Sequence, residues 1–211
     1  MDKIDQINTF NRLIKVSRET IISLKKYENI LIEANKKLNL VGKSTINEIW
    51  IRHFLDCAQV IDFIDKNDKI ALDMGSGAGF PGLIVAIIAK DRKISLKVEL
   101  AEKSPKKKIF LNEVINKLKL NAEVIDQDIL NTKVKFDKDV FFARAFKPLN
   151  IILELIHNNA QNWKKIFIFL GKTGDQQLIQ ASNNWDIKYK QSMSVTNKDS
   201  KIIEINKLVK K

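Results

Sequence analysis

The stretch of this chain with the clearest chemical character spans residues 70–82 and has the sequence IALDMGSGAGFPG. An apolar, strand-like run ends in Asp73, and Gly75, Gly77 and Gly79 follow at alternate positions before an apolar, helix-like run. Glycine permits positive φ and lets a ligand contact the backbone where a Cβ would otherwise stand. Open α/β sheets bind ligands beyond the carboxyl ends of their strands. The stretch therefore predicts a ligand-binding turn; the alternative is a glycine-rich turn without a ligand.

Two ligands suit this turn, because Gly77, Gly79 and Gly82 also satisfy the dinucleotide fingerprint G-x-G-x-x-G. Two features favour S-adenosyl-L-methionine over NAD as the cofactor. A carboxylate at Asp73 would crowd a pyrophosphate, but it suits the ammonium group of a methionine moiety. Pro81 at the start of the helix removes one backbone N–H that a pyrophosphate would use. An NAD-dependent oxidoreductase is the alternative interpretation.

Acids after the next two predicted strands extend the expected cofactor site. Glu102 follows the strand at residues 96–101, where a carboxylate can accept hydrogen bonds from both ribose hydroxyls. The alternative for Glu102 is a solvated acid that stabilises the start of the next helix. Asp128 follows the third strand and could accept from the adenine amine, with Ile129 or Leu130 against the ring. A purely local turn role for Asp128 is the competing interpretation.

From residue 70 onward, short apolar runs alternate with helical stretches, which is typical of βαβ units around a parallel sheet. The expected strands span residues 70–74, 96–101, 123–126, 139–143, 165–170, 186–192 and 201–208, and the expected helices span 82–90, 105–119, 149–161 and 174–182. The last two strands have no helix between them and should form an antiparallel hairpin at the sheet edge. The pattern predicts an α/β protein with the class I S-adenosylmethionine-dependent methyltransferase fold: a Rossmann-like, mostly parallel seven-stranded sheet.

An N-terminal helical extension over residues 1–65 should pack on a core of residues 66–211, so that the two parts form one structural domain. Leu24, Tyr27, Leu31 and Ile32 recur at helical spacing and predict one apolar face. Residues 45–48, with the sequence TINE, fit a capping box that would start a helix reaching residue 64. The residues expected to face inward from that helix are Ile49, Trp50, Phe54, Ala58 and Ile61.

The composition favours a polyanionic partner inside the cell. The formal net charge is +12 over 211 residues, which favours a nucleic-acid partner. The alternative is compositional drift in an AT-rich genome, which enriches lysine over arginine, since only five of the basic residues are arginine. Lys103, Lys106, Lys107 and Lys108 form a cluster that could attract phosphate or simply be a solvated face. The single cysteine, Cys57, suits a reducing compartment. With no apolar leader or membrane-length apolar run, we expect a cytoplasmic protein without a membrane partner.

Four further polar or aromatic side chains are candidates for a substrate pocket. Arg144 and Phe146 follow the fourth strand. A buried guanidinium needs an anionic partner, such as the donor's carboxylate or an RNA phosphate. The Phe146 ring could stack on a base or be a core aromatic. His53 and Asp56 lie three residues apart on one predicted helix face and could form part of a target pocket or a packing pair. The sequence contains no G-x-S-x-G motif, so a serine hydrolase is not expected. It has only two histidines and no further ligands beside them, so no metal site is expected.

The chain resembles the glucose-inhibited division protein B family, the bacterial 16S ribosomal RNA guanine-N7 methyltransferases. The matching pieces are residues 39–41 (NLV), 52–56 (RHFLD), 72–82 (LDMGSGAGFPG) and 143–146 (ARAF). Their order and spacing match over nearly the whole chain. The resemblance implies methyl transfer to N7 of guanine 527 of the small-subunit RNA. Position by position, it implies cofactor contacts at Gly75, Phe80, Ile129, Leu130 and Arg144.

The chain departs from the family pattern at two places. The family often has Leu-Lys-Gly after the fifth strand, whereas this chain has Leu170, Gly171 and Lys172, so Lys172 is only a candidate for that lysine's role. Cys57 stands where the family often has serine. The implied partner is 16S rRNA or the small ribosomal subunit, and we expect a monomer. A non-catalytic RNA-binding module is the remaining alternative.

Overall fold

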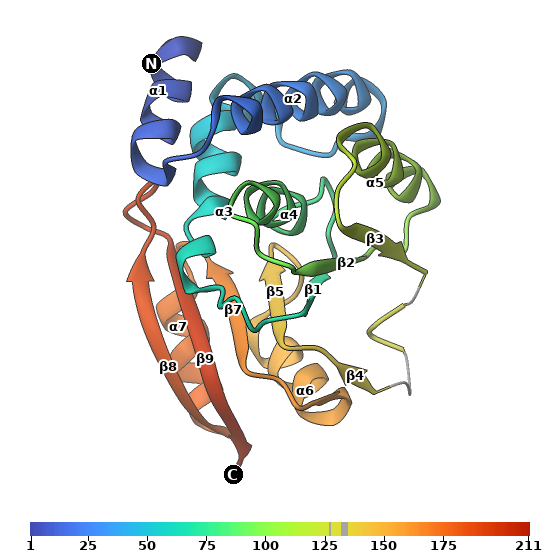
Figure 1. Ribbon diagram of the computed structural model, residues 1–211. Helices are drawn as coiled ribbons and strands as arrows, with labels where there is room; N and C mark the ends of the chain where they lie inside the picture. Colours follow the sequence, from blue (N-terminus) through green and yellow to red (C-terminus); the bar gives the residue numbers. More distant parts are fainter. Residues whose placement is uncertain (127, 132–134) are drawn as a thin grey trace.

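The computed structural model describes residues 1–126, 128–131 and 135–211. Its centre is a seven-stranded sheet with the order β3-β2-β1-β5-β7-β9-β8 (Figure 1). The strands are β1 (Ile70–Met74), β2 (Lys97–Ala101), β3 (Ala122–Ile125), β5 (Val140–Arg144), β7 (Lys165–Leu170), β8 (Trp185–Met193) and β9 (Lys201–Lys210). The first five in the sheet order are parallel, and β9 and β8 run antiparallel at the edge. The predicted mostly parallel sheet with an edge hairpin is confirmed.

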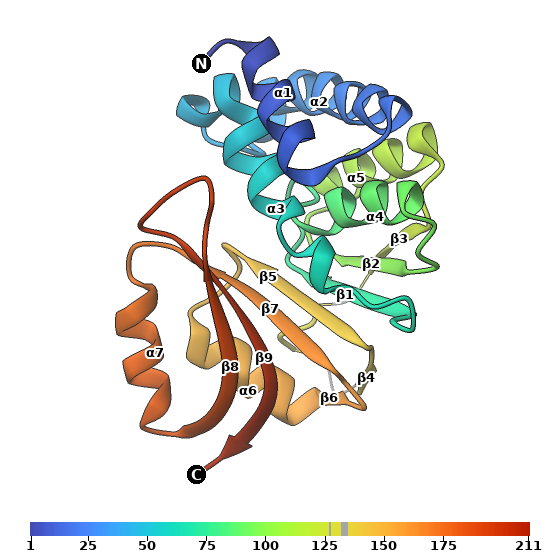
Figure 2. The same cartoon turned by 60° about the vertical axis from the view of Figure 1, so that its left-hand side comes forward.

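Helices cover both faces of this sheet, as parallel strands require because their two faces are apolar. One face carries α4 (Gly82–Asp91) and α5 (Pro105–Leu118), and the other carries α6 (Leu149–Asn159) and α7 (Gly174–Ser182) (Figure 2). The apolar residues of the two faces form separate clusters on either side of the strands. The chain leaves β1 toward β2 and later crosses to β5 on the other side. This reversal beside β1 is the position at which open α/β sheets bind their ligands.

The N-terminal helices α1 (Lys3–Ile14) and α2 (Arg18–Leu38) pack over the α4 and α5 side of the core (Figure 1). Three of the four residues predicted for the apolar face, Leu24, Tyr27 and Leu31, are fully buried, whereas Ile32 is half-buried. The start of α2 is also tied to the core by a hydrogen bond of 2.7 Å from the Thr20 hydroxyl to the Asp91 carboxylate at the end of α4. The extension therefore shares one hydrophobic core with the sheet.

The segment after α2 is irregular, and the predicted single helix with a capping box is wrong. It consists of the 3-10 helix η1 (Lys43–Glu48), the π-helix η2 (Trp50–Leu55), the short α3 (Asp56–Ala58) and the 3-10 helix η3 (Ile61–Phe63). Thr45 does not cap a helix, because its hydroxyl donates to the Gly42 carbonyl at 2.9 Å. Tertiary contacts override the local pattern: the Trp50 indole donates to the Glu28 carboxylate at 3.1 Å and Trp50 packs edge-on against Phe54. All five residues expected to face inward are buried.

A second small feature has no counterpart in the sequence pattern. The two-residue strands β4 (Phe136–Asp137) and β6 (Ala160–Gln161) pair in parallel outside the main sheet. The helix expected over 149–161 therefore ends at Asn159, because the backbone of Ala160 is already extended. Among the described helices, none has the length and apolar character needed to cross a membrane.

Candidate active site

The glycine turn follows β1 and takes a backbone course that only glycine adopts easily. Gly75, Gly77 and Gly79 have φ angles of 73°, 56° and 89°. A Cβ on Gly75 would lie 2.3 Å from Cδ2 of Phe146, and a Cβ on Gly79 would lie 2.3 Å from Cδ1 of Leu83. Glycine at 75 and 79 is therefore required both by the backbone angle and by close neighbours. At Gly77 only the backbone angle requires it.

Asp73 is the penultimate residue of β1, just before this turn, and is fully buried. One carboxylate oxygen, Oδ2, accepts from the Gly82 backbone N–H at 3.0 Å. The other, Oδ1, has no hydrogen-bond partner among the described residues. Burial is the main cause that raises the pKa of Asp73 to about 7. Burying a carboxylate oxygen without a hydrogen-bond partner costs free energy unless a ligand supplies that partner. A positively charged ligand group would favour the ionised form of Asp73.

Glu102 lies between β2 and α5 and joins the glycine turn to the start of that helix. Its two carboxylate oxygens accept from the backbone N–H of Gly77 at 3.0 Å and of Ser104 at 2.8 Å. Each carboxylate oxygen has a second lone pair, so these bonds leave capacity for a ligand hydroxyl. A second acid nearby in the sequence, Glu99, lies inside β2 and pairs with Lys138 at 2.7 Å. The geometry therefore favours Glu102 over Glu99 as the acid that faces a ligand.

A cleft of about 250 Å³ opens beside the turn, at the carboxyl ends of β1 and β2. Five residues predicted to contact the cofactor line this cleft: Gly75, Glu102, Asp128, Ile129 and Leu130. The carboxylate of Asp128 accepts from the Leu130 N–H at 3.2 Å and from the Asn131 side chain at 2.7 Å, so it also holds its own turn. The structure thus gathers residues that lie more than fifty positions apart in the sequence.

The other predicted cofactor residues do not line this cleft. Asp73 lies in β1, and Gly77 and Gly79 lie in the turn that follows, whereas Phe80 and Arg144 face the N-terminal segment. The Phe80 ring is stacked on the His53 imidazole, with centroids 5.1 Å apart and planes 2° apart.

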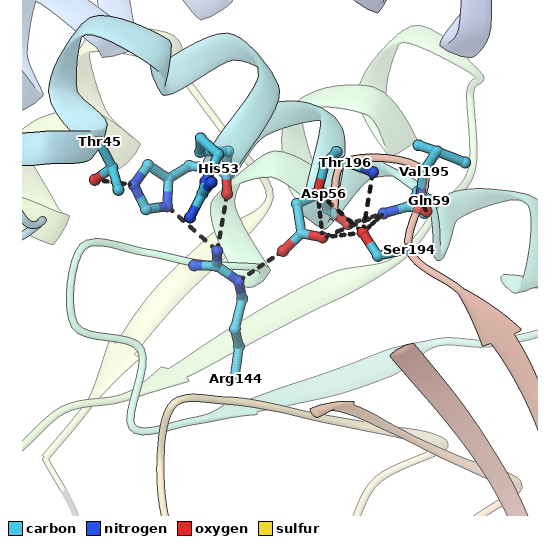
Figure 3. A network of polar contacts seen from close by, with 9 residues as sticks. Thr45, His53, Asp56, Gln59, Arg144, Ser194, Val195 and Thr196 are labelled. Carbon is cyan, nitrogen blue, oxygen red and sulfur yellow. Dashed lines mark hydrogen bonds and ion pairs between the residues drawn. The ribbon is translucent and has the colours of Figure 1, made fainter. Parts of the chain in front are cut away.

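Arg144 is the centre of a polar network that joins β5 to the N-terminal segment (Figure 3). Its Nε donates to Asp56 Oδ2 at 3.1 Å, and its Nη2 donates to the Arg52 carbonyl at 3.0 Å and to His53 Nδ1 at 3.3 Å. A guanidinium can only donate, so Nδ1 of His53 accepts and Nε2 carries the proton. That Nε2 lies 2.9 Å from the Thr45 hydroxyl. The anionic partner expected for the buried guanidinium is thus a carboxylate of the protein.

Burial, together with the charges of Arg144 and Arg52, lowers the pKa of His53 to about 3. The imidazole is therefore neutral near pH 7 and acts in this network as an acceptor and a donor of hydrogen bonds. His53 and Asp56 meet through Arg144, which lies between them (Figure 3).

Three hydrogen bonds that complete this region have no sequence motif. The β8–β9 loop places the hydroxyls of Ser194 and Thr196 at 2.8 and 3.1 Å from Oδ1 of Asp56 (Figure 3). The Tyr27 hydroxyl on α2 donates to the Ala78 carbonyl in the glycine turn. These hydroxyl side chains lie far from their partners in the sequence and form no motif of fixed spacing with them. Their contacts can therefore be identified only in the folded structure.

Of the remaining candidates, Phe146 lines the cleft, whereas Lys172 and Cys57 lie apart from it. Lys172 is exposed in the turn between β7 and α7 and does not line the cleft. Cys57 is buried, and burial strongly raises the pKa of its thiol, which leaves it unreactive at neutral pH. In the described part of the chain, no three acidic, histidine or cysteine side chains are grouped to hold a metal ion.

The sheet order and the glycine turn after β1 define the class I S-adenosylmethionine-dependent methyltransferase fold. Solved structures agree: the fold is similar to M. capricolum TrmK in complex with S-adenosyl-homocysteine (TM-score 0.54, 20% identity, 72% of this chain and 67% of that chain). It is also similar to the TehB-like methyltransferase from Corynebacterium glutamicum (TM-score 0.53, 15% identity, 74% of this chain and 88% of that chain). The chain belongs to the GidB family, rRNA small subunit methyltransferase G, whose model matches residues 20–206.

Curated relatives support this family. "Ribosomal RNA small subunit methyltransferase G" of Pelagibacter ubique (strain HTCC1062) is 41% identical over 198 residues, covering 93% of this chain and 92% of the relative. The protein with that name from Rickettsia akari (strain Hartford) is 34% identical over 197 residues, covering 93% and 99%. The resemblance found in the sequence is confirmed, and family membership favours a methyltransferase over an oxidoreductase or a non-catalytic RNA-binding module.

Proposed function

We propose that this chain transfers a methyl group from S-adenosyl-L-methionine to N7 of a guanine in 16S rRNA, guanine 527 in the usual RNA numbering. Family membership and the fold support an S-adenosylmethionine-dependent rRNA methyltransferase. The observation that carries the proposal is the cleft in which the glycine turn, Glu102 and the 128–130 loop meet. We further propose that the protein acts in the cytoplasm, as a monomer, on 16S rRNA or the small ribosomal subunit.

The residues around the cleft fit the methyl donor. Asp73 offers a buried carboxylate oxygen without a partner, which suits the donor's ammonium group directly or through water. Glu102 offers free lone pairs to the ribose hydroxyls, and the apolar side chains of Ile129 and Leu130 suit the adenine ring. Gly75 exposes its backbone to the cleft, and the positive φ angles of Gly77 and Gly79 set the conformation of the turn. When bound, S-adenosyl-L-methionine supplies an electrophilic methyl group on its sulfonium.

Phe80 and Arg144 would serve this site indirectly. Arg144 binds Asp56 and the Arg52 carbonyl, and the Phe80 ring lies between the His53 ring and the aromatic residues of the N-terminal segment. Both residues flank the glycine turn or the end of β5, so they fix the position of the backbone that lines the cleft. We therefore assign them a positioning role and not a direct contact with the donor.

The chemistry at N7 demands little proton transfer from the protein. N7 of neutral guanine already carries an available lone pair, so no general base is required. The side chains agree with this requirement, because His53 is neutral and hydrogen-bonded and Cys57 is a buried, protonated thiol. The protein would accelerate the reaction by positioning the two reactants and by excluding water.

Replacing His53 with alanine should lower kcat by about tenfold, because Arg144 loses an acceptor and Phe80 loses its stacked partner. His53→Asn keeps an oxygen that can accept from Arg144 and should lose less. At saturating donor, kcat of the wild type should stay flat between pH 6 and 8, because the pKa of His53 is about 3. Steady-state methyl transfer from labelled donor measures both effects. A wild-type rise near pH 6.5 that the alanine variant lacks would instead assign proton transfer to His53.

The lysines at the rim of the cleft are the proposed contacts for RNA phosphates. Lys103, Lys107 and Lys147 line the cleft, whereas Lys108 is paired with Asp126 at 2.5 Å. Lys103→Glu combined with Lys107→Glu should weaken RNA binding and reduce the slope of log affinity against log salt by about 1–2. Filter binding across a salt series measures both. Lys25→Glu with Lys26→Glu, exposed on α2, is the matched control; equal behaviour of the two variants would make the rim lysines a solvated face.

Mass spectrometry of rRNA tests the proposed function directly. Small subunits from cells that lack this protein, incubated with the purified chain and S-adenosyl-L-methionine, should gain one 7-methylguanosine in 16S rRNA. Reduction followed by aniline should then cleave the RNA at that nucleotide, because the methylated ring is cationic. A methyl group found on another atom or on another RNA would overturn the proposal.

A further inference from the structure

A second cleft adjoins the proposed donor site. It has a volume of about 560 Å³ and lies where β5 and β7 end and α6 and α7 begin. Ala145, Phe146 and Lys147 line both clefts, so the two clefts adjoin at this tripeptide. The buried side chains of Ile152, Ile168 and Leu170 also line the second cleft. The cleft therefore offers an apolar wall next to the place where the methyl group would be presented.

The tripeptide between the clefts has an unusual backbone. Ala145 has a φ of 51°, in the left-handed region that costs a residue with a Cβ about 1–2 kcal/mol. This turn brings the half-buried ring of Phe146 onto Gly75, whose missing Cβ would otherwise lie 2.3 Å from the ring. Unfavourable backbone of this kind persists where the surrounding structure requires it, and it is concentrated at functional sites. Phe146 is thus fixed as the aromatic border shared by the two clefts.

Helix α7 supplies amide side chains to the opposite side of the second cleft. Gln177 is already engaged, because its Oε1 accepts from the Leu149 N–H at 2.9 Å and its Nε2 donates to the Thr173 hydroxyl at 3.1 Å. Gln176 and Gln180 also line the cleft, are exposed, and lie one helical turn apart on the same face. Their amides are free of hydrogen bonds to the residues that the structure describes, so they can bind a ligand.

We infer that this second cleft holds the target guanine, with its ring against Phe146 and its 2-amino edge on Gln176 and Gln180. The inference rests on the proposed function and assigns residues for base recognition. A glutamine amide can accept from the 2-amino group and N1–H of guanine and can donate to O6. N7 and the 2-amino group lie on different edges of the purine. A base whose 2-amino edge contacts α7 can therefore turn N7 toward Phe146 and the donor cleft.

Inosine at the target position tests this assignment, because it lacks only the 2-amino group and keeps N7. Small subunits would be reconstituted with 16S rRNA carrying guanine or inosine at that nucleotide. We would measure kcat/KM on both for the wild type, for Gln176→Ala combined with Gln180→Ala, and for Gln191→Ala. Gln191 is exposed on β8 and lines a different cleft, so it is the matched control. The lower N7 reactivity of inosine is common to all three proteins and cancels when their ratios are compared.

The guanine-to-inosine ratio should fall by about tenfold in the double variant, through a lower kcat/KM on guanine, and should be unchanged in Gln191→Ala. Donor affinity by calorimetry should stay within about twofold of wild type, which also shows that the variant is folded. A wild-type ratio in the double variant, or a parallel loss of donor affinity, would overturn the assignment. If the wild type methylates neither RNA, the proposed function fails first, and that outcome is distinguishable from a failure of the base site alone.

Discussion

Asp73→Asn should weaken the binding of S-adenosyl-L-methionine by at least about a hundredfold. The carboxylate is fully buried and one of its oxygens has no partner in the described structure, so the donor's ammonium group would be its missing counter-charge. Removing one member of a buried charge pair costs about 3–5 kcal/mol. Isothermal titration calorimetry with the purified protein measures the loss. Asp186→Asn, exposed on β8, is the matched control and should bind the donor as the wild type does.

The same carboxylate should make donor affinity depend on pH. Burial raises the pKa of Asp73 to about 7 in the protein without donor. Below that pH the acid is protonated and neutral, and an ammonium ligand must displace the proton before it can pair. Donor affinity should therefore rise by about tenfold or more between pH 5.5 and 7.5, and then level off. The Asp73→Asn variant should show a flat profile over that range. A wild-type affinity that does not change with pH would remove Asp73 from the ammonium contact.

Most of the core elements could be predicted because their patterns are local. The expected strands at 70–74 and 165–170 and the expected helix at 174–182 coincide with β1, β7 and α7. Parallel strands buried on both faces leave continuous apolar runs, and turn residues separate them from amphipathic helices. The grouping of Glu102 with the glycine turn followed from topology alone, because the carboxyl ends of parallel strands meet at one edge.

The contacts around Asp56 could not be predicted in the same way. Ser194 lies 138 positions away along the chain, and neither residue belongs to a spaced motif. The prediction of one regular helix in the segment from 43 to 63 was wrong for a related reason. Its capping pattern favoured a regular helix, but the burial of Trp50 and the hydrogen bonds of the Arg144 network favoured 3-10 and π turns. Tertiary contacts decide the conformation of such a segment, and a single sequence does not state which contacts form.

For Arg144, residue chemistry predicted the kind of partner but not its identity. The sequence correctly predicted that the Arg144 guanidinium, after the fourth predicted strand, has an anionic partner. The candidates expected for that partner were the donor's carboxylate and an RNA phosphate. In the structure the partner is Asp56, at 3.1 Å, with the side chain turned away from the cleft. A protein carboxylate can satisfy the same electrostatic requirement without any ligand, and only the folded chain distinguishes the two cases.

RNA that carries 7-deazaguanine at the target nucleotide should accept no methyl group. In that base a C–H replaces N7, so the lone pair that would attack the sulfonium methyl is absent. The 2-amino group, N1–H and O6 remain, and the substituted subunit should still bind the protein with wild-type affinity. Incorporation of labelled methyl and filter binding, measured on the same preparations, separate the loss of reaction from a loss of binding. If this RNA were still methylated at the target, N7 would not be the accepting atom. Methylation at N1 or at the 2-amino nitrogen would need a group to remove a proton there, and neither the neutral His53 nor the buried Cys57 thiol is suited to that task.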